Sequence, residues 1–546
     1  MAFPKPLKID PARLVVDDGK VIDAAHGDWY FQYDGLDETR YVYLEGSGLL
    51  DFLASGKDLV VCEIGFGTGL TYRLVQEAMT ACGFQGRLRY VGVEGRPLDA
   101  NQAQAANDLR PDALRWQPPT PQPRAGFVRA SEDLLLLHGD AAEALSRLSA
   151  RVDVWFLDGF SPSKNPDAWT SEIYAQMARL SRPGARLSTF TAAGDVRRGL
   201  EHAGFETAKR TGWAKKREHL TARFGGQWAP RPKPVSPLSI IGGGVAGLML
   251  GLEADSLGWD ATLYGTGEAA QGSAVPFALV NYRPSGDQGP LGHLRRAGFF
   301  HLHRYAPNAQ AGVEALVSDD KLRQRWGEER DIVHHWVAPD RVRVEQALSV
   351  DTAAFRARVL AQVEHRPDPI TALPKGPIAL AAGLGTKALL DGLSLRANRG
   401  QQDQVTLDKP MSHPLNFGRL LLPFTEGNDA WLGASFDRNP PENWQEPRDD
   451  DRVENLRRLN DALPELHATA TGASWVGLRA TTPDHLPLAG WSEDNLAVLT
   501  GLGSKGFLYA PILASCLLSG ALGLPLPLER WVWDALDPFR HKPKEP

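Results

Sequence analysis

The sequence predicts an α/β protein made of two domains in tandem, and three observations support this prediction. First, 546 residues are more than one ordinary domain usually holds. Second, the proline-rich segment 226–237 is typical of a stiff linker, and it separates an expected first domain, residues 1–225, from a second, residues 238–546. Third, each part contains an apolar strand followed by a glycine-rich turn and a helix, a pattern that holds nucleotide-type ligands.

The composition is that of a globular protein. Hydrophobic residues make up 42% and charged residues 23%, which excludes a disordered or fibrous chain. The formal net charge of −6 argues against an overall basic nucleic-acid coat, but it leaves room for a local basic patch. Three scattered cysteines cannot form a disulfide framework, and the N-terminus lacks the apolar core of a signal peptide, so we expect a cytoplasmic protein.

Two other patterns could indicate a membrane-spanning segment or a metal site. No charged residue occurs between Lys505 and Glu529, a length that could span a bilayer, but prolines and glycines interrupt it. We therefore expect a buried helix and a loop there. The histidines at 301–303 and 334–335 have no carboxylate or cysteine close in sequence, so we expect them to be structural and predict no metal site.

In the first domain, residues 59–79 predict a buried strand, a tight turn and an amphipathic helix. Gly65, Gly67 and Gly69 allow the backbone to approach a ligand at the helix N-terminus. Their spacing, G-x-G-x-G, differs from the G-x-G-x-x-G of dinucleotide sites and favours a ligand without pyrophosphate, such as S-adenosylmethionine (SAM). We include Glu63, at the end of the strand, among the residues expected to bind SAM. The alternative is that the glycines serve only a tight turn.

Three carboxylates follow later strands of this domain. Glu94, 25 residues after Gly69, could accept both ribose hydroxyls, and Asp140 could accept the adenine amino group. Asp158 ends a fourth strand, at the sheet edge where ligands bind in open α/β folds. Methylation of an amine near neutral pH needs a base or a desolvating pocket. Asp158 is our candidate base, and the alternative is a positioning role.

A basic stretch, residues 209–217, follows Arg197 and Arg198 near the end of the first domain. Such a stretch is often a solvated face, but its place between the predicted catalytic domain and the linker favours contact with phosphates.

Four segments of this domain resemble the methyltransferase half of the bacterial bifunctional proteins of tRNA 5-methylaminomethyl-2-thiouridine biosynthesis. They are DGLDETRYVYLEG (34–46), EIGFGTGL (63–70), FLDGFSPSKNPDAW (156–169) and TFTAAGDVRRGLEHAGF (189–205). The resemblance covers most of residues 20–225. It implies methylation of the aminomethyl group on the wobble uridine of certain tRNAs, with Asp158 in the DGF motif.

The second domain opens with a G-x-G-x-x-G pattern. Gly242, Gly244 and Gly247 follow an apolar strand and suit a pyrophosphate at a helix N-terminus. The next strand ends at Gly265 instead of the acid that would bind ribose, and the first acid after it is Glu268.

The order of motifs resembles the glycine-oxidase and D-amino-acid-oxidase-like flavoenzymes, and in particular the C-terminal half of the same bifunctional family. The resemblance spans about 238–541 and is most specific at GLRATTPD and GLGSKG. It implies a site for FAD, for which we also expect Gly383, Gly503 and Ser504. It further implies oxidation beside a secondary amine, which releases glyoxylate and leaves a primary amine. Residues 272–282 depart from the family's pattern near the flavin.

A glycine-like substrate arm needs its carboxylate held, and arginine can do this with two parallel hydrogen bonds. Arg479 lies in the GLRATTPD motif and is the expected partner, with Lys505 assisting. The alternative is that Arg479 is a surface residue in a turn.

Together these patterns predict a bifunctional enzyme that uses SAM and FAD to modify the wobble uridine in a tRNA anticodon loop. The flavin half would remove a carboxymethyl group, and the other half would methylate the exposed amine. Three alternatives stay open: a small-molecule amine methyltransferase fused to an amino-acid oxidase, a non-catalytic tRNA-binding protein, and a methyltransferase with an inactive flavin domain.

Overall fold

The computed structural model describes residues 3–541 except 33–34, 121, 215, 230–235, 267–271, 306–307, 330–331, 371, 425–426 and 493–494. The described residues thus omit part of the predicted linker, Asp34, Lys215 and Glu268. The chain divides into two compact units, one of residues 1–233 with 519–530 and one of residues 234–518 with 531–546. Residues 519–530, which we expected in the second domain, belong to the first unit, where the Leu526 N–H donates to the Ser149 carbonyl (3.0 Å).

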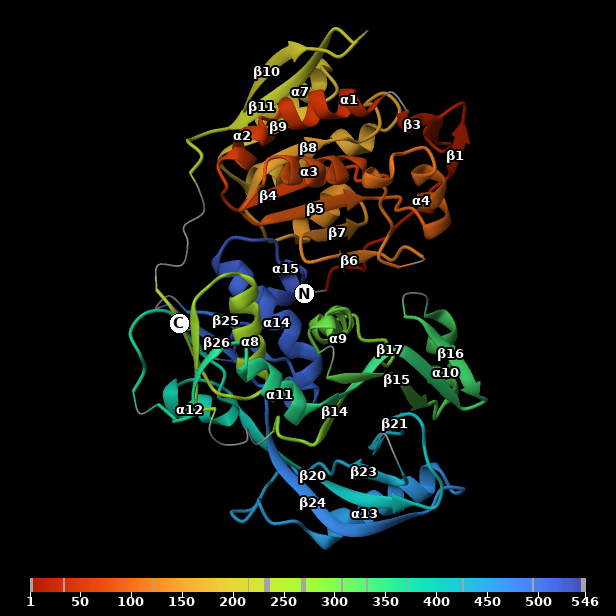
Figure 1. The fold of residues 1–546 in the computed structure, drawn as a ribbon, viewed down its shortest axis with the longest axis vertical. Helices are drawn as coiled ribbons and strands as arrows, with labels where there is room; N and C mark the ends of the chain where they lie inside the picture. The colour runs from red at the N-terminus through yellow and green to blue at the C-terminus, as the bar shows by residue number, and fades with distance from the viewer. Residues whose placement is uncertain are drawn as a thin grey trace. The chain divides into compact units, whose positions relative to one another are not determined.

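The main sheet of the first unit runs in the order β10-β11-β9-β8-β4-β5-β7-β6 (Figure 1). Its strands are β4 (Leu59–Ile64), β5 (Leu88–Glu94), β6 (Gly126–Arg129), β7 (Leu134–His138), β8 (Val152–Leu157), β9 (Ser181–Thr189), β10 (Phe205–Thr211) and β11 (Glu218–Phe224). The central strands are parallel, and the chain order reverses at β4, with β5 on one side and β8 on the other. In open α/β sheets, this reversal marks the crevice in which a ligand binds.

The helices of the first unit connect these strands. They are α1 (Leu36–Thr39), α2 (Leu49–Ala54), α3 (Leu70–Ala81), α4 (Ala100–Asn107), α5 (Ala141–Arg147), α6 (Ser171–Leu180) and α7 (Gly194–His202). A small antiparallel sheet precedes them, formed by β1 (Leu14–Asp17), β2 (Lys20–Asp23) and β3 (Asp28–Gln32). A π-helical turn, Arg40–Glu45, follows α1 directly.

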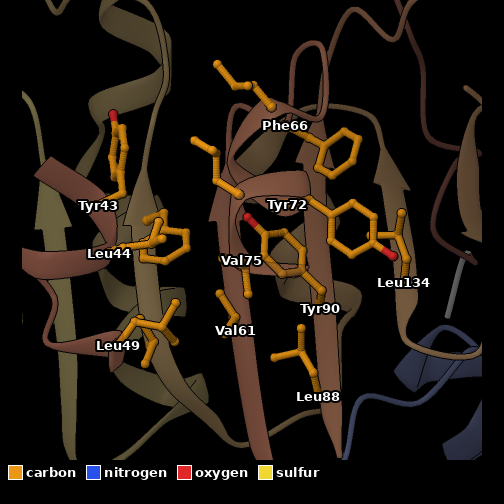
Figure 2. Close-up of a cluster of buried hydrophobic side chains, with 14 of the residues drawn as sticks. Tyr43, Leu44, Leu49, Val61, Phe66, Tyr72, Val75, Leu88, Tyr90 and Leu134 are labelled. Atoms are coloured by element: carbon orange, nitrogen blue, oxygen red, sulfur yellow. The ribbon is translucent and has the colours of Figure 1, made fainter. Parts of the chain in front are cut away.

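Strand β4 lies in the core of this unit and is apolar except for Glu63. All six of its residues are buried, as expected for a central parallel strand that is covered on both faces. Val75 of α3 packs with Val61 of β4 and Tyr90 of β5 in one cluster (Figure 2). Tyr43, from the π-helical turn, lies in the same cluster. The core therefore holds the helix after the glycine loop and the segment that carries Tyr43.

The second unit contains two sheets. One runs β18-β13-β12-β19-β26-β25, and the other runs β14-β17-β15-β21-β22-β23-β20-β24, with β16 paired to β17. The strands are β12 (Leu238–Ile241), β13 (Ala261–Tyr264), β14 (Phe277–Val280), β15 (Ala309–Leu316), β16 (His334–Ala338), β17 (Arg341–Asp351), β18 (Glu364–Arg366), β19 (Ile378–Leu380), β20 (Arg396–Leu407), β21 (Leu415–Asn416), β22 (Leu420–Pro423), β23 (Asp429–Gly433), β24 (Ala468–Thr481), β25 (Leu488–Trp491) and β26 (Leu496–Thr500). The first sheet is parallel apart from its edge pair β25–β26.

The helices after residue 238 are α8 (Val245–Ser256), α9 (Pro290–Phe299), α10 (Asp320–Glu328), α11 (Thr352–Leu360), α12 (Thr386–Leu389), α13 (Asp449–Ala462), α14 (Gly506–Ala521) and α15 (Arg530–Asp534). Leu459 of helix α13 and Leu463, which directly follows the helix, pack against the second sheet. The predicted buried helix is α14, which contains Pro511. Within the part of the chain that the structure describes, no helix combines the length and apolar character needed to cross a membrane.

Helix α8 lies close to the loop that follows β12. A Cβ atom at Gly247 would collide with the Gly242 carbonyl oxygen, so only glycine permits this contact between the helix and the loop. Gly247 therefore sets the position of the helix N-terminus, which is the part expected to meet a pyrophosphate.

We expect Gly247→Ala to destabilise the second unit by about 1–3 kcal/mol, because an added methyl group overpacks this contact. Gly251→Ala is the matched control on the same helix, since the three atoms nearest to its Cβ all belong to the Val363 side chain and the closest lies at 3.3 Å. Urea denaturation followed by circular dichroism measures both variants. Equal stability of the two would contradict the proposed role of Gly247.

Candidate active sites

The first unit contains a cavity of 650 Å³, lined by residues at the carboxyl ends of β4, β5 and β8 and by the small N-terminal sheet. Five of the residues predicted to act in this unit line it: Gly65, Gly67, Glu94, Asp140 and Asp158. The topology thus brings together side chains that are far apart in the sequence. Gly69 and Glu63 are not among the lining residues.

The glycine loop adopts a conformation that favours glycine. Gly65 has φ +89°, and a Cβ atom there would collide with the backbone carbonyl of Asp158. Gly69 has φ +69° and precedes the first turn of α3. The loop therefore lies directly on the end of β8, and the backbone N–H groups of the α3 N-terminus are available to a ligand.

Glu94 joins this loop to the end of β5. Its carboxylate accepts the Gly67 N–H (2.8 Å) and the Arg96 N–H (2.7 Å), one on each oxygen. Burial raises the pKa of Glu94, and these backbone hydrogen bonds oppose that shift. Each carboxylate oxygen keeps a second acceptor position. The residue therefore fits the predicted contact with ribose hydroxyls while it also fixes the loop.

The other two predicted carboxylates differ in their surroundings. Asp140 caps α5 by accepting the Glu143 N–H (3.0 Å), and it stays exposed at the cavity. Glu63 is buried in the sheet, where it accepts a hydrogen bond from the Tyr90 hydroxyl (2.8 Å). Burial raises the pKa of Glu63 well above its ordinary value. The Glu63 side chain therefore lies inside the sheet, bonded to Tyr90, and does not line the cavity.

Asp158 lies at the end of β8 and faces the cavity. Burial raises the pKa of its carboxyl to about 7, while a hydrogen bond from Tyr43 and the charge of Lys216 oppose that shift. A carboxyl group with this pKa can accept a proton near neutral pH. Tyr43 itself stays protonated, because burial raises its pKa well above the ordinary value.

Sequence reasoning missed Tyr43 and Glu38, which also line the cavity, and it placed Lys216, a third lining residue, in a stretch predicted to contact phosphates. Lys216 forms an ion pair with Glu38 (2.6 Å) and lies over the ring of Phe190. Two of these residues fall inside a segment that supported the family resemblance, residues 34–46, but no spacing rule links that segment to Asp158. The Tyr43 hydroxyl reaches the Asp158 carboxylate, to which it donates a hydrogen bond, only because the π-helical turn has folded.

The basic stretch predicted for phosphate contact lies on the hairpin of β10 and β11. Several of its cations already have partners: Lys209 pairs with Glu218 (2.6 Å), and Arg210 donates to the Glu45 carbonyl (3.0 Å). Arg197, on α7, pairs with Glu201 (2.9 Å). Phosphate contact by this stretch stays a prediction.

The second unit contains a larger cavity, of 1040 Å³. Gly242 and Gly244 line it at the N-terminus of α8, where Gly244 is the capping residue, whereas Gly247 is not a lining residue. The Val245 N–H donates to the Ser273 hydroxyl (3.0 Å). Ser273 belongs to the segment 272–282 that departs from the family's pattern, and much of that segment lines the cavity.

The remaining predicted flavin residues, Gly383, Gly503 and Ser504, also line this cavity. Gly265, at the end of β13, lines it as well. The described lining residues include cationic side chains and no aspartate or glutamate; the cations are Arg283, Arg295, Arg325, Arg419, Arg479 and Lys505. A glycine turn at a helix N-terminus within a positive cavity fits a cofactor that carries a pyrophosphate.

Arg479 and Lys505 face this same cavity. Arg479 lies within β24 and not in a surface turn; it donates to the Ser435 carbonyl (3.4 Å), and its guanidinium lies over the Phe436 ring. Burial lowers the pKa of Arg479 to about 10. Lys505 donates to the Asn281 side chain (3.4 Å), and burial lowers its pKa to about 8. Neither cation has a carboxylate among the described residues that line the cavity.

Geometry and comparison with known proteins define one class, a methyltransferase joined to a flavin-dependent oxidoreductase. Residues 115–224 match the family described as S-adenosyl-L-methionine-dependent methyltransferase. Residues 238–519 match the family described as FAD dependent oxidoreductase. The predictions of the fold class and of the two cofactors, SAM and FAD, are therefore confirmed.

Relatives of similar length narrow this class to a family. The tRNA 5-methylaminomethyl-2-thiouridine biosynthesis bifunctional protein of Caulobacter vibrioides is 35% identical, over 94% of this chain and 95% of that protein. The protein of the same name from Pseudomonas aeruginosa is 31% identical, over 96% of each. This chain belongs to the family of bifunctional proteins of tRNA 5-methylaminomethyl-2-thiouridine biosynthesis. Among solved structures, glycine oxidase from Geobacillus kaustophilus is similar at 17% identity, with a TM-score of 0.44 over 56% of this chain and 99% of that one.

We predict that methyl transfer depends on the ionisation of Asp158. The unprotonated carboxylate is the form that accepts a proton, so the rate should rise with pH through about 7 and then level off. Tyr43→Phe removes a hydrogen bond that lowers this pKa, so the midpoint should move to higher pH. Single-turnover transfer of a labelled methyl group measures both profiles. Tyr41→Phe is the control, because its hydroxyl donates to the Thr211 carbonyl instead (3.0 Å); equal midpoints for the two variants would remove Tyr43 from this role.

We predict that Glu94→Ala weakens SAM binding at least tenfold, because hydrogen bonds to a charged group contribute about 1.5–3 kcal/mol each. The variant also frees the Gly67 N–H, so part of the loss comes from the loop. Calorimetry with SAM measures the affinity. Asp108→Ala, which removes an exposed carboxylate after α4, should leave the affinity unchanged. Wild-type affinity in the Glu94 variant would contradict the placement of the ribose at β5.

Proposed function

We propose that this protein carries out two consecutive steps on the wobble uridine of tRNA. The second unit removes the carboxymethyl group from 5-carboxymethylaminomethyl-(2-thio)uridine in an FAD-dependent reaction. The first unit then methylates the exposed 5-aminomethyl group with SAM. One observation carries the proposal: each cavity contains a buried charged group suited to its own step, the Asp158 carboxyl with its hydrogen bond from Tyr43 in the first and the Arg479 guanidinium in the second.

In the oxidative step, Arg479 holds the carboxylate of the substrate arm through charge-assisted hydrogen bonds. This contact fixes the methylene carbon that lies between the carboxylate and the secondary amine. FAD, when bound by the loop at Gly242 and Gly244, supplies the two-electron oxidation of the carbon–nitrogen bond. Addition of water to the resulting substrate imine breaks that bond and yields glyoxylate and the primary amine. Lys505 adds a second positive charge to the same cavity.

In the methylation step, Asp158 accepts the proton that the amine loses as its nitrogen becomes bonded to carbon. Tyr43 orients the carboxylate through its hydrogen bond. SAM, when bound by the glycine loop with Glu94 on its ribose and Asp140 on its adenine, supplies the methyl group. The cavity wall excludes water from the amine, which favours the neutral form that has a free lone pair.

The partner implied by this proposal is the anticodon loop of a tRNA. Bases in such a loop are already single-stranded, so moving one into a cavity costs less than flipping it out of a duplex. Two sites on one chain also keep the intermediate at a high effective concentration. A tRNA substrate is consistent with a cytoplasmic location, which we include in the proposal.

Nucleoside mass spectrometry in a bacterial strain that lacks this activity tests the proposal. The wild-type chain should restore 5-methylaminomethyl-uridine derivatives, Asp158→Asn should accumulate the aminomethyl form, and Arg479→Ala should accumulate the carboxymethylaminomethyl form. Arg396→Ala, which removes an exposed arginine on the neighbouring strand β20, is the control and should behave as wild type. Accumulation of the aminomethyl form by Arg479→Ala would overturn the division of labour. If the wild-type chain leaves only the carboxymethylaminomethyl form, the result would favour a small-molecule enzyme pair.

A further inference from the structure

A second arginine lies beside Arg479 in the flavin cavity. Arg419 comes from the hairpin of β21 and β22, and it donates to the Ala434 carbonyl. Arg479 comes from β24 and donates to the next carbonyl along the chain, that of Ser435. Both side chains line the cavity. Two separate elements therefore bring two guanidinium groups to consecutive carbonyls of one segment.

The charges of this pair are not neutralised inside the cavity. Its described lining residues include no carboxylate. Burial lowers the pKa of Arg419, and the carboxylates whose charges oppose this shift, Glu454 and Asp451, do not line the cavity. Burial, and after it the charge of Arg419, lowers the pKa of Arg479. The buried Nε atom of Arg419 has no hydrogen-bond partner among the described residues. Two cations held together at low dielectric repel each other, and an anion between them removes the repulsion.

A glycine in the sheet, Gly400 of β20, provides the space that the Arg479 guanidinium occupies. The guanidinium of Arg479 lies on the backbone of β20 at Gly400, where a Cβ atom would collide with its nitrogens. A side chain at position 400 would push the guanidinium away. The absence of a side chain at Gly400 thus permits the position of the Arg479 guanidinium in the pair with Arg419.

We propose that Arg419 is a further substrate-binding residue, and that Arg419 and Arg479 together form a subsite for the carboxylate of the carboxymethyl arm. This inference rests on the proposed function of the cavity and names the group that selects its substrate. An arm without a carboxylate would leave both cations unpaired, so the subsite rejects neutral arms as well as binding the correct one.

The same pair of arginines favours release of the modified nucleoside after the oxidative step. Before cleavage, the carboxylate of the arm lies between two cations. After cleavage, glyoxylate carries the negative charge, and the arm left on the base has lost its carboxylate and keeps only an amine that binds a proton. The two guanidinium groups attract the first product and repel the second. The modified nucleoside is therefore driven out of this cavity once its carboxymethyl group is lost.

Acetate binding to the purified, FAD-loaded protein tests the subsite without turnover. Acetate stands in for the carboxylate, and its binding is followed through the visible absorption of the flavin. We expect Arg419→Ala to weaken acetate at least tenfold, and Gly400→Ala to weaken it by displacing Arg479. Arg438→Ala is the matched control, because this exposed arginine lies against the same Phe436 ring but does not line the cavity. Wild-type acetate affinity in Arg419→Ala would overturn the proposal.

A kinetic experiment on tRNA that carries the carboxymethylaminomethyl group tests the same residue in the reaction. Arg419→Ala should raise KM for glyoxylate release at least tenfold, and added guanidinium ion should restore part of the loss. If Arg419→Ala fails to retain FAD, Arg419→Lys takes its place, with weaker acetate binding expected because lysine lacks the planar fork. Suppose that acetate binding depends on Arg419 but the wild-type protein releases no glyoxylate. This pair of results would contradict the proposed function and support the subsite. Glyoxylate release unaffected by either Arg419 variant would overturn the subsite and leave the function intact.

Discussion

Removal of water from a few charged side chains is the constraint on which both sites depend. The same cause acts with opposite sign in the two cavities: it raises the pKa of Asp158 towards neutrality and lowers the pKa values of Arg479 and Lys505. A carboxyl that can take up a proton suits an amine nucleophile. A poorly hydrated guanidinium suits a substrate that brings its own negative charge. The folds around these groups serve to keep water away and to fix the geometry.

The two units solve the problem of cofactor binding with related backbone devices. Each places a glycine turn between a buried strand and a helix N-terminus. The units differ in what surrounds the turn. In the first, Glu94 accepts backbone hydrogen bonds from the turn and leaves acceptor positions for a sugar. In the second, arginines and a lysine line the same cavity as the turn and make it positive. The lack of a pyrophosphate in one ligand and its presence in the other accounts for this difference.

Much of this arrangement could be predicted from the sequence, because strand, glycine turn and helix are local patterns. Gly65, Gly242 and Asp158 were found in this way, and the topology places them at cavities as expected. The glycines at 69 and 247 were found by the same spacing, but their role is to shape the turn and the helix contact. Glu63 was expected to bind cofactor because it precedes the loop, yet strand alternation turns its side chain to Tyr90. Tyr43 and Arg419 could not be found, since each reaches its site through a long-range contact that no spacing encodes.

The contact between Gly65 and Asp158 has a consequence for how this fold can change over time. At Gly65 the glycine turn lies against backbone atoms at the end of β8, those of Asp158 and Gly159. This backbone contact does not depend on which side chain stands at 158, so under the proposed function the base at 158 can be exchanged while the contact persists. The glycine that permits the contact and the proposed base are thus two separate positions in the sequence. A lineage can lose or replace one of them without rebuilding the other.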